Sequence, residues 1–253
     1  MNLNFTGRKL PWEKEEFNVL SFDFGGKNSC DDFEILIARR PDLPSPKRRV
    51  NTIDIPGRDS NLRFDENTYD DIILTVECSV KDTHNLADKI DDIKAWLFTA
   101  GESDLIFSFQ PDKKYIAQVV NAIDFKQVYK YFSEFPVIFN CRPFKYAVEN
   151  DLMNIISSGT VIINPGTVES EPVMNIYGSG DIVLKVNDEQ ISFKGVTEKI
   201  IVNSVIQDCY DDAGNNLNAK MAGEFPKLKP GENIIEWSGD VVKAELLPNW
   251  RWL

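Results

Sequence analysis

Pairs of adjacent carboxylates are the most frequent pattern in this sequence that could carry acid–base chemistry. The Asp-Asp pairs among them are Asp31-Asp32, Asp70-Asp71, Asp91-Asp92 and Asp211-Asp212. A general acid and a general base must converge in space and sit in different environments. Neighbouring residues of a strand point to opposite faces, so adjacency in sequence favours solvated charges here. These pairs do not predict a catalytic site.

Three further patterns fall short of known sites. His84 is the only histidine, and no G-x-S-x-G motif or nearby nucleophile accompanies it. Gly178-Ser179-Gly180 lacks the Gly-Lys-Ser/Thr ending and the following helix of a phosphate loop. The third pattern is a possible calcium site, with oxygen ligands from Asp208, Asp211 and Asp212. The spacing of an EF-hand loop and its terminal Glu are both missing. We therefore expect no enzyme, no cofactor and no metal site.

The cysteines are widely separated, which argues against both zinc binding and a disulfide framework. They are Cys30, Cys78, Cys141 and Cys209. No C-x-x-C motif occurs, and one histidine cannot complete a zinc site. Scattered single cysteines are typical of buried, reduced thiols in a protein made in a reducing compartment. We expect four free thiols.

The charge balance is acidic, with a formal net charge of −12. Residues 1–145 carry 20 Lys and Arg against 24 Asp and Glu, and residues 146–253 carry 8 against 16. Nucleic-acid binding needs clustered cations, so no nucleic-acid partner is expected. The basic cluster Lys47-Arg48-Arg49 is interpreted as a solvated or interface loop. No signal-peptide core or membrane-length apolar run occurs, which predicts a soluble, cytosolic product without membrane insertion.

The first half predicts strands around one helix. Gly25-Gly26 suggests a hairpin between apolar runs at 17–24 and 33–38, and three prolines predict an extended loop over 41–49. Leu86, Ile90, Ile93 and Leu97 form one stripe, which predicts a helix over 85–100, capped by Asn85 and stopped by Gly101. Strands are expected at 72–80, 105–109, 115–123 and 128–139.

A polar alternation followed by a turn stands between these elements. Residues 52–55 alternate polar and apolar, as a half-buried strand does. Pro56-Gly57 breaks the ladder and places Arg58 and Asp59 on a turn. After this turn, the strand at 72–80 is expected to return the chain toward the start of the turn. The simplest interpretation is an ordinary connector with a loose ion pair.

The second half predicts an antiparallel sandwich. Turn signals recur every 8–12 residues or so, and no repeat of fixed period is present. The expected strands are 160–163, 173–177, 182–186, 191–193, 199–202, 234–237 and 241–247. Turns are expected between them, including residues 178–181 and 238–240. The polar stretch after Pro143 predicts a boundary within 143–152, giving domains 1–145 and 146–253.

Six motifs in chain order carry a family resemblance. They are Phe24-Gly25-Gly26 with Ser29-Cys30-Asp31-Asp32-Phe33; Ile55-Pro56-Gly57-Arg58-Asp59; Phe139-Asn140-Cys141-Arg142-Pro143; Asn164-Pro165-Gly166-Thr167 with Ser170-Glu171-Pro172; Gly178-Ser179-Gly180-Asp181; and residues 225–233. In order and spacing, the chain resembles the distal tail protein (Dit) family of siphophages and prophages of Gram-positive bacteria. It departs at Ser60, where many relatives have Gly.

The resemblance implies a mainly β fold: a β-rich α+β N-terminal domain with one helix, and a C-terminal galectin-like antiparallel β-sandwich. It implies a structural protein at the distal end of the virion tail, assembled in the host cytoplasm. The implied assembly is a hexameric ring, stacked back-to-back in some cases, that joins the tail tube to the tail-tip hub. The implied partners are the protein itself, the major tail or tube protein, the tail-associated hub protein and a receptor-binding protein.

The resemblance and the turn together predict an interface. We expect Ile55, Pro56, Gly57, Arg58 and Asp59 at a subunit or tube contact, with Arg58 and Asp59 paired within or between chains.

A carbohydrate-binding module that contacts the host cell wall directly is the alternative function. Sugar-binding sandwiches usually stack an exposed aromatic ring on the sugar, and Trp237, Trp250 and Trp252 are available. Packing of these tryptophans into the body of the protein is the expectation we favour. A phospholipase or tail lysin lacks the necessary residues.

Overall fold

The computed structural model describes residues 19–82, 85–129 and 131–253. The single histidine, His84, lies outside the described residues, as does the amino-terminal segment examined for a signal peptide. The chain divides into two compact units, and each is described by itself. The first contains Met1–Leu43, Ile73–Gln110 and Ala117–Asn140, and the second contains Pro44–Ile72, Pro111–Ile116 and Cys141–Leu253. The predicted division between residues 145 and 146 falls inside a continuous strand, β10.

The first unit is built on a sheet with the strand order β2-β1-β7-β8-β10-β6-β3. Its strands are β1 (Phe22–Phe24), β2 (Lys27–Asn28), β3 (Ile35–Ile37), β6 (Ile72–Lys81), β7 (Ser103–Phe107), β8 (Lys113–Val119) and β10 (Phe132–Ala147), with β9 (Lys126–Tyr129) paired to β10. Strand β6 alternates strictly, with buried side chains from Ile72 to Val80 on one face. The strand predicted from the apolar run at 72–80 is confirmed.

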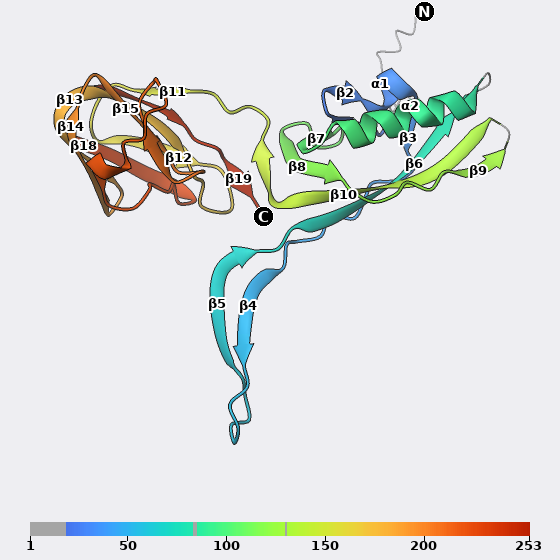
Figure 1. The fold of residues 1–253 in the computed structure, drawn as a ribbon, viewed down its shortest axis with the longest axis horizontal. Coiled ribbons are helices and arrows are strands. Elements are labelled where there is room, and N and C mark those ends of the chain that lie inside the picture. Colours follow the sequence, from blue (N-terminus) through green and yellow to red (C-terminus); the bar gives the residue numbers. More distant parts are fainter. Residues whose placement is uncertain (1–18, 83–84, 130) are drawn as a thin grey trace, which may run out of the picture. The chain divides into compact units, whose positions relative to one another are not determined.

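Helix α2 (Leu86–Thr99) lies along this sheet (Figure 1). Trp96 is one of its buried residues. The Trp96 indole stacks on Phe33, with ring centres 4.4 Å apart, and lies 5.8 Å from Phe22. Its Nε1–H donates to the Phe24 carbonyl oxygen at 2.9 Å. The Asn85 side chain accepts from the Asp88 N–H at the start of the helix. The predicted helix and its cap are confirmed.

Two predictions in this half are wrong in their pairing. The Gly25-Gly26 turn joins β1 to the short β2, whereas residues 35–37 form β3 and pair with β6. The helix α1 (Ser29–Phe33) intervenes because the Asn28 side chain accepts from the Cys30 and Asp31 N–H groups. Residues 128–139 are not one strand, because β9 ends at Tyr129 and β10 begins at Phe132.

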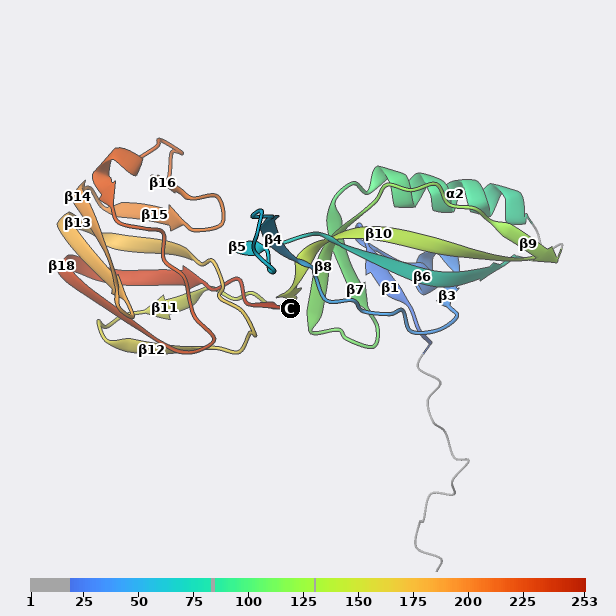
Figure 2. The same ribbon diagram turned by 90° about the horizontal axis from the view of Figure 1, so that it is seen from below.

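An antiparallel sandwich makes up most of the second unit (Figure 2). Its strands are β11 (Met153–Ile155), β12 (Thr160–Asn164), β13 (Val173–Val186), β14 (Glu189–Val196), β15 (Lys199–Asn203), β16 (Asp208–Tyr210), β17 (Met221–Ala222) and β18 (Gly231–Leu247), with a 3₁₀ turn at Asn218–Lys220. Side chains that alternate inward from these strands share one apolar core, which includes Met174, Ile182, Phe193 and Trp250. The predicted sandwich is confirmed.

The expected turns at 178–181 and 238–240 are wrong, because β13 and β18 continue through them. The first part of β13 pairs with β15 and its second part pairs with β14, while β18 stays beside both. Each strand therefore bends from one layer of the sandwich to the other. Glycine permits the bend: a Cβ on Gly178 would lie 2.2 Å from the Asp240 carbonyl oxygen, and one on Gly239 would lie 2.4 Å from that of Asp181.

The chain ends by returning to β10. Strand β19 (Arg251–Trp252) pairs antiparallel with Lys145 and Tyr146. No helix among the described residues is long and apolar enough to cross a membrane.

Candidate interaction surfaces

A two-stranded hairpin in the second unit contains the predicted interface residues. Among the described residues, strand β4 (Arg48–Ile53) pairs with β5 (Leu62–Tyr69) and with no other strand. Figure 1 shows the two strands side by side with their connecting loop at the far end. Every residue of β4 is exposed. An isolated two-stranded hairpin is marginally stable in water, so this ribbon is expected to gain stability from a partner.

The two faces of the hairpin differ in polarity. Ile53 lies opposite Leu62, and Asn51 lies opposite Phe64, which places the three apolar side chains on one face. Ile53, Leu62 and Phe64, the apolar hairpin face, are 53%, 45% and 63% exposed. The other face carries Thr52 opposite Arg63. Contiguous exposed apolar side chains rimmed by polar ones mark interaction sites.

Ion pairs join the two strands near the base of the hairpin. Arg48 pairs with Asp65 at 2.8 Å, and Arg49 pairs with Asp70 at 2.6 Å. The hydrogen bond that the Arg49 guanidinium donates to the Asp70 carboxylate raises the pKa of the guanidinium. These exposed ion pairs add little stability, but they engage Arg48 and Arg49, two of the three cations of the basic cluster. That cluster was expected in a loop, and the structure places Arg48 and Arg49 in β4 instead.

The predicted interface residues form the turn at the tip. The Arg58 N–H donates to the Ile55 carbonyl oxygen at 3.1 Å, and Gly57 has a φ of 83°. Proline at the second position and a left-handed glycine at the third are typical of a type II turn. Both charged side chains that follow, Arg58 and Asp59, are exposed. No ion pair of the described residues includes either one.

Strand β5 was missed by the sequence analysis, which expected β6 to bring the chain back. The signal was present, because residues 62–65 alternate between apolar and charged. Pairing of β5 with β4 is local, across an eight-residue connection from residue 54 to residue 61.

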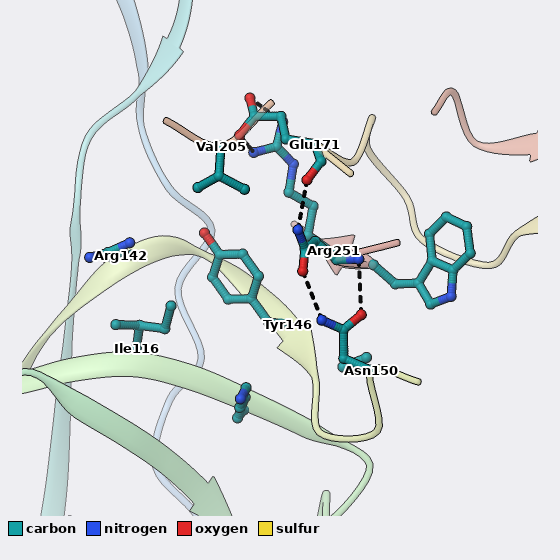
Figure 3. Close-up of a pocket in the computed structure, with 11 residues that line it drawn as sticks. Ile116, Arg142, Tyr146, Asn150, Glu171, Val205 and Arg251 are labelled. Atoms are coloured by element: carbon teal, nitrogen blue, oxygen red, sulfur yellow. Dashed lines mark hydrogen bonds and ion pairs between the residues drawn. The ribbon is translucent and has the colours of Figure 1, made fainter. Parts of the chain in front are cut away.

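A pocket of about 200 Å³ also lies within the second unit (Figure 3). Figure 3 shows Arg251 and Glu171 joined on one side, and their side-chain atoms lie 3.1 Å apart. Asn150 donates to the Asn249 side-chain oxygen at 2.7 Å and accepts from the Asn249 N–H at 3.0 Å. The pocket-lining residues come from five separate segments of the chain, so no local motif could have predicted the pocket. Its single lining carboxylate, that of Glu171, is held by Arg251, which leaves no carboxylate pair for acid–base catalysis.

The carboxylates considered for chemistry serve local structure. Asp32 accepts from the Asn28 N–H at 2.7 Å, and Asp212 pairs with Lys199 at 2.6 Å. Asp211 accepts from the Asn215 side chain and from backbone N–H groups, which lower the pKa of its carboxyl. In the part of the chain that the structure describes, no cluster of His, Cys, Asp or Glu could hold a metal ion.

The three candidate sugar-stacking tryptophans pack against the protein. Trp250 is 7% exposed within the sandwich core, and Trp237 and Trp252 pack against that core. Lys113 also lies over the Trp252 ring, with Nζ 4.8 Å from its centre. This agrees with the expectation that they are packing residues.

Comparison with known proteins connects the fold to a family. Residues 30–141 match the model of the phage tail protein RIFT-related domain. The chain contains a phage tail protein domain. This Dit-like protein also superposes on the Dit protein (gp 19.1) of phage SPP1 with a TM-score of 0.75 and 15% identity, over 93% of this chain and 100% of that one. That protein is described as a paradigm of the hub adsorption apparatus in phages that infect Gram-positive bacteria. The curated proteins contain no match.

The recognition made from the sequence motifs is therefore confirmed by the family model and the fold. Residues 30–141 thus carry a phage tail protein domain, and the chain as a whole shares the fold of SPP1 Dit. Its mainly β architecture also agrees with the fold that the resemblance implied.

Proposed function

We propose that the Dit-like protein forms a hexameric ring at the distal end of the tail, where it joins the tail tube to the tail-tip hub. The phage tail domain and the fold shared with SPP1 Dit support this role. The observation that carries the assembly is the hairpin, whose apolar face is exposed in a single chain. A second copy is its proposed partner, through a heterologous contact that closes when the rotation returns to the first subunit.

Burial of the apolar hairpin face would supply the driving force. Removing apolar surface from water contributes about 25 cal/mol per Å², so each large side chain adds roughly 1.5–3 kcal/mol when fully buried. The tip, Ile55–Asp59, would reach the same neighbour or the tube. The assembly partners proposed besides the protein itself are the tube protein, the hub protein and a receptor-binding protein.

The test measures the mass of the purified protein in solution. We expect light scattering to show a hexamer, or an association that rises with concentration, and negative-stain images to show rings. Phe64→Ser should weaken the association. Arg63→Ala is the matched control, because Arg63 is adjacent in sequence but points to the polar face. A monomer at all concentrations, also in the presence of hub proteins, would overturn the proposal.

A further inference from the structure

Strand β12 is a free edge of the sandwich with unusually little to protect it. It pairs with β18 and with no other strand among the described residues. Edge strands leave backbone N–H and C=O groups unpaired, and proteins usually guard them with charged side chains. Residues 152–168, which contain β11 and β12, include no charged residue in a chain that is 27% charged. This edge therefore lacks the usual protection.

The outward side chains at this edge are apolar. Val161 and Ile163 are 53% and 65% exposed, and Ile234 lies beside them on β18, opposite Val161. The alternate residues Ile162 and Asn164 point inward and are buried. An added strand would find both backbone partners and a short apolar stripe on the same side of the sheet.

Carboxylates of β18 lie beside the stripe. Glu232 lies opposite Ile163 on β18, and Glu236 follows on the same face. Lys185 pairs with Glu236 at 3.3 Å, whereas no ion pair among the described residues includes Glu232. The binding surface therefore has a neutral, apolar centre with the Glu232 carboxylate beside it.

We propose that the free edge of β12 accepts a β-strand from another protein, neutral and β-branched along the paired segment and basic at its ends. Charge at the edge itself decides between this occupant and a second copy. The same edge of a second copy, residues 152–168, carries no cation that could face Glu232. A basic-flanked strand meets Glu232 with opposite charge. This strand-addition site is separate from the hairpin and does not depend on ring formation.

The experiment uses the full chain and a labelled probe peptide, acetyl-Lys-Thr-Val-Thr-Val-Thr-Lys-amide, followed by fluorescence anisotropy. A second probe has Pro in place of the central Thr, which removes a backbone donor, and a third has Glu in place of both Lys. We expect saturable binding of the first probe only. Hydrogen exchange should slow at β12 when that probe binds.

The variant Ile163→Lys should weaken binding of the first probe about tenfold or more, equivalent to 1.4 kcal/mol, because it charges the edge. Val242→Lys is the matched control. Val242 is an exposed apolar residue of the same sandwich, and it lies beyond the part of β18 that pairs with β12. The Val242→Lys protein should therefore bind the first probe as the wild type does. Both sites are exposed, so folding should be retained, as thermal unfolding will show.

Three results would overturn the proposal. One is the absence of saturable binding up to the solubility limit of the first probe. Another is equal binding of the proline probe or of Ile163→Lys. The third is self-association of the wild type that Ile163→Lys abolishes while the hairpin variant Phe64→Ser retains it, which would make a second copy the occupant. If the wild-type protein forms no hexamer but still binds the first probe, the proposed ring is contradicted and the proposed strand-addition site is not.

Discussion

The guanidinium group of Arg251 lies over the ring of Phe144, with Cζ 4.6 Å from the ring centre. The same guanidinium pairs with Glu171 at 3.1 Å and donates to the Glu169 carbonyl oxygen. One side chain thus ties β19 both to β10 and to the loop that precedes β13. Its stacked, two-sided geometry suits arginine and not lysine.

The first prediction concerns this contact. Arg251→Lys should lower the free energy of unfolding by about 1–3 kcal/mol, because a half-buried carboxylate loses its forked partner. Lys185→Ala removes an exposed ion pair and should cost less than about 1 kcal/mol. Urea unfolding of both variants provides the measurement. Equal effects would show that Arg251 is only a surface residue.

The second prediction concerns the bend of β13. Gly178→Ala should destabilise the sandwich by about 2 kcal/mol or more, since the added Cβ would meet the Asp240 carbonyl oxygen and backbone must move. Ser179→Ala, at the exposed next position, should cost less than about 1 kcal/mol. Thermal unfolding of the two variants checks this. A Gly178→Ala protein as stable as the wild type would contradict the role of the glycine.

The third prediction concerns thiol accessibility. Cys30 is partly exposed, and Cys78, Cys141 and Cys209 are buried free thiols. We expect one cysteine to react with a thiol reagent in the folded protein and all four after denaturation without reductant. Two or fewer reactive thiols in the denatured protein would reveal a disulfide.

The fourth prediction is a loss of stability at high pH. Burial raises the pKa of the Cys209 thiol from 9.0 to about 11. A group whose pKa is higher in the folded state stabilises the fold fully below its unfolded pKa, and the contribution is lost as pH rises through the folded value. Between pH 9 and 11 this thiol should cost the wild type up to about 1.4 kcal/mol per pH unit.

Cys209→Ala should therefore show a shallower fall in the free energy of unfolding over that range than the wild type. Val202→Ala, at the paired position on β15, lowers stability without removing a titrating group and should keep the wild-type slope. Urea unfolding at several pH values measures both. Parallel slopes for all three proteins would refute the assignment.

The fifth prediction concerns the hairpin tip. Arg58→Ala should weaken assembly by on the order of 2–5 kcal/mol if its partner is Asp59 of a neighbouring chain in a desolvated contact. Unfolding of the separate units should stay nearly unchanged, because Arg58 is exposed in the single chain. Arg58→Asp combined with Asp59→Arg should restore part of the loss. Normal assembly of Arg58→Ala would make the turn a fold element only.

The sequence by itself determined the elements whose signals are local. Helix α2 followed from the apolar stripe of Leu86, Ile93 and Leu97 and the Asn85 cap, because helical periodicity and capping act within a few residues. Strand β6 and most sandwich strands followed from short apolar runs and, in the sandwich, from the turn signals between them, which are also local. The order of weak turn motifs was enough to indicate the family.

Only the tertiary structure decided how those elements pair. Gly178 and Gly239 read as turns, yet each permits a bend in a continuous strand, because the carbonyl oxygen that approaches them comes from a distant residue. The pocket and the Arg251 contacts also join distant segments. Phe64 is exposed because, among the described residues, no strand other than β4 pairs with the strand that contains it. Such facts depend on contacts between segments far apart in the chain, and local residue preferences contain no information about them.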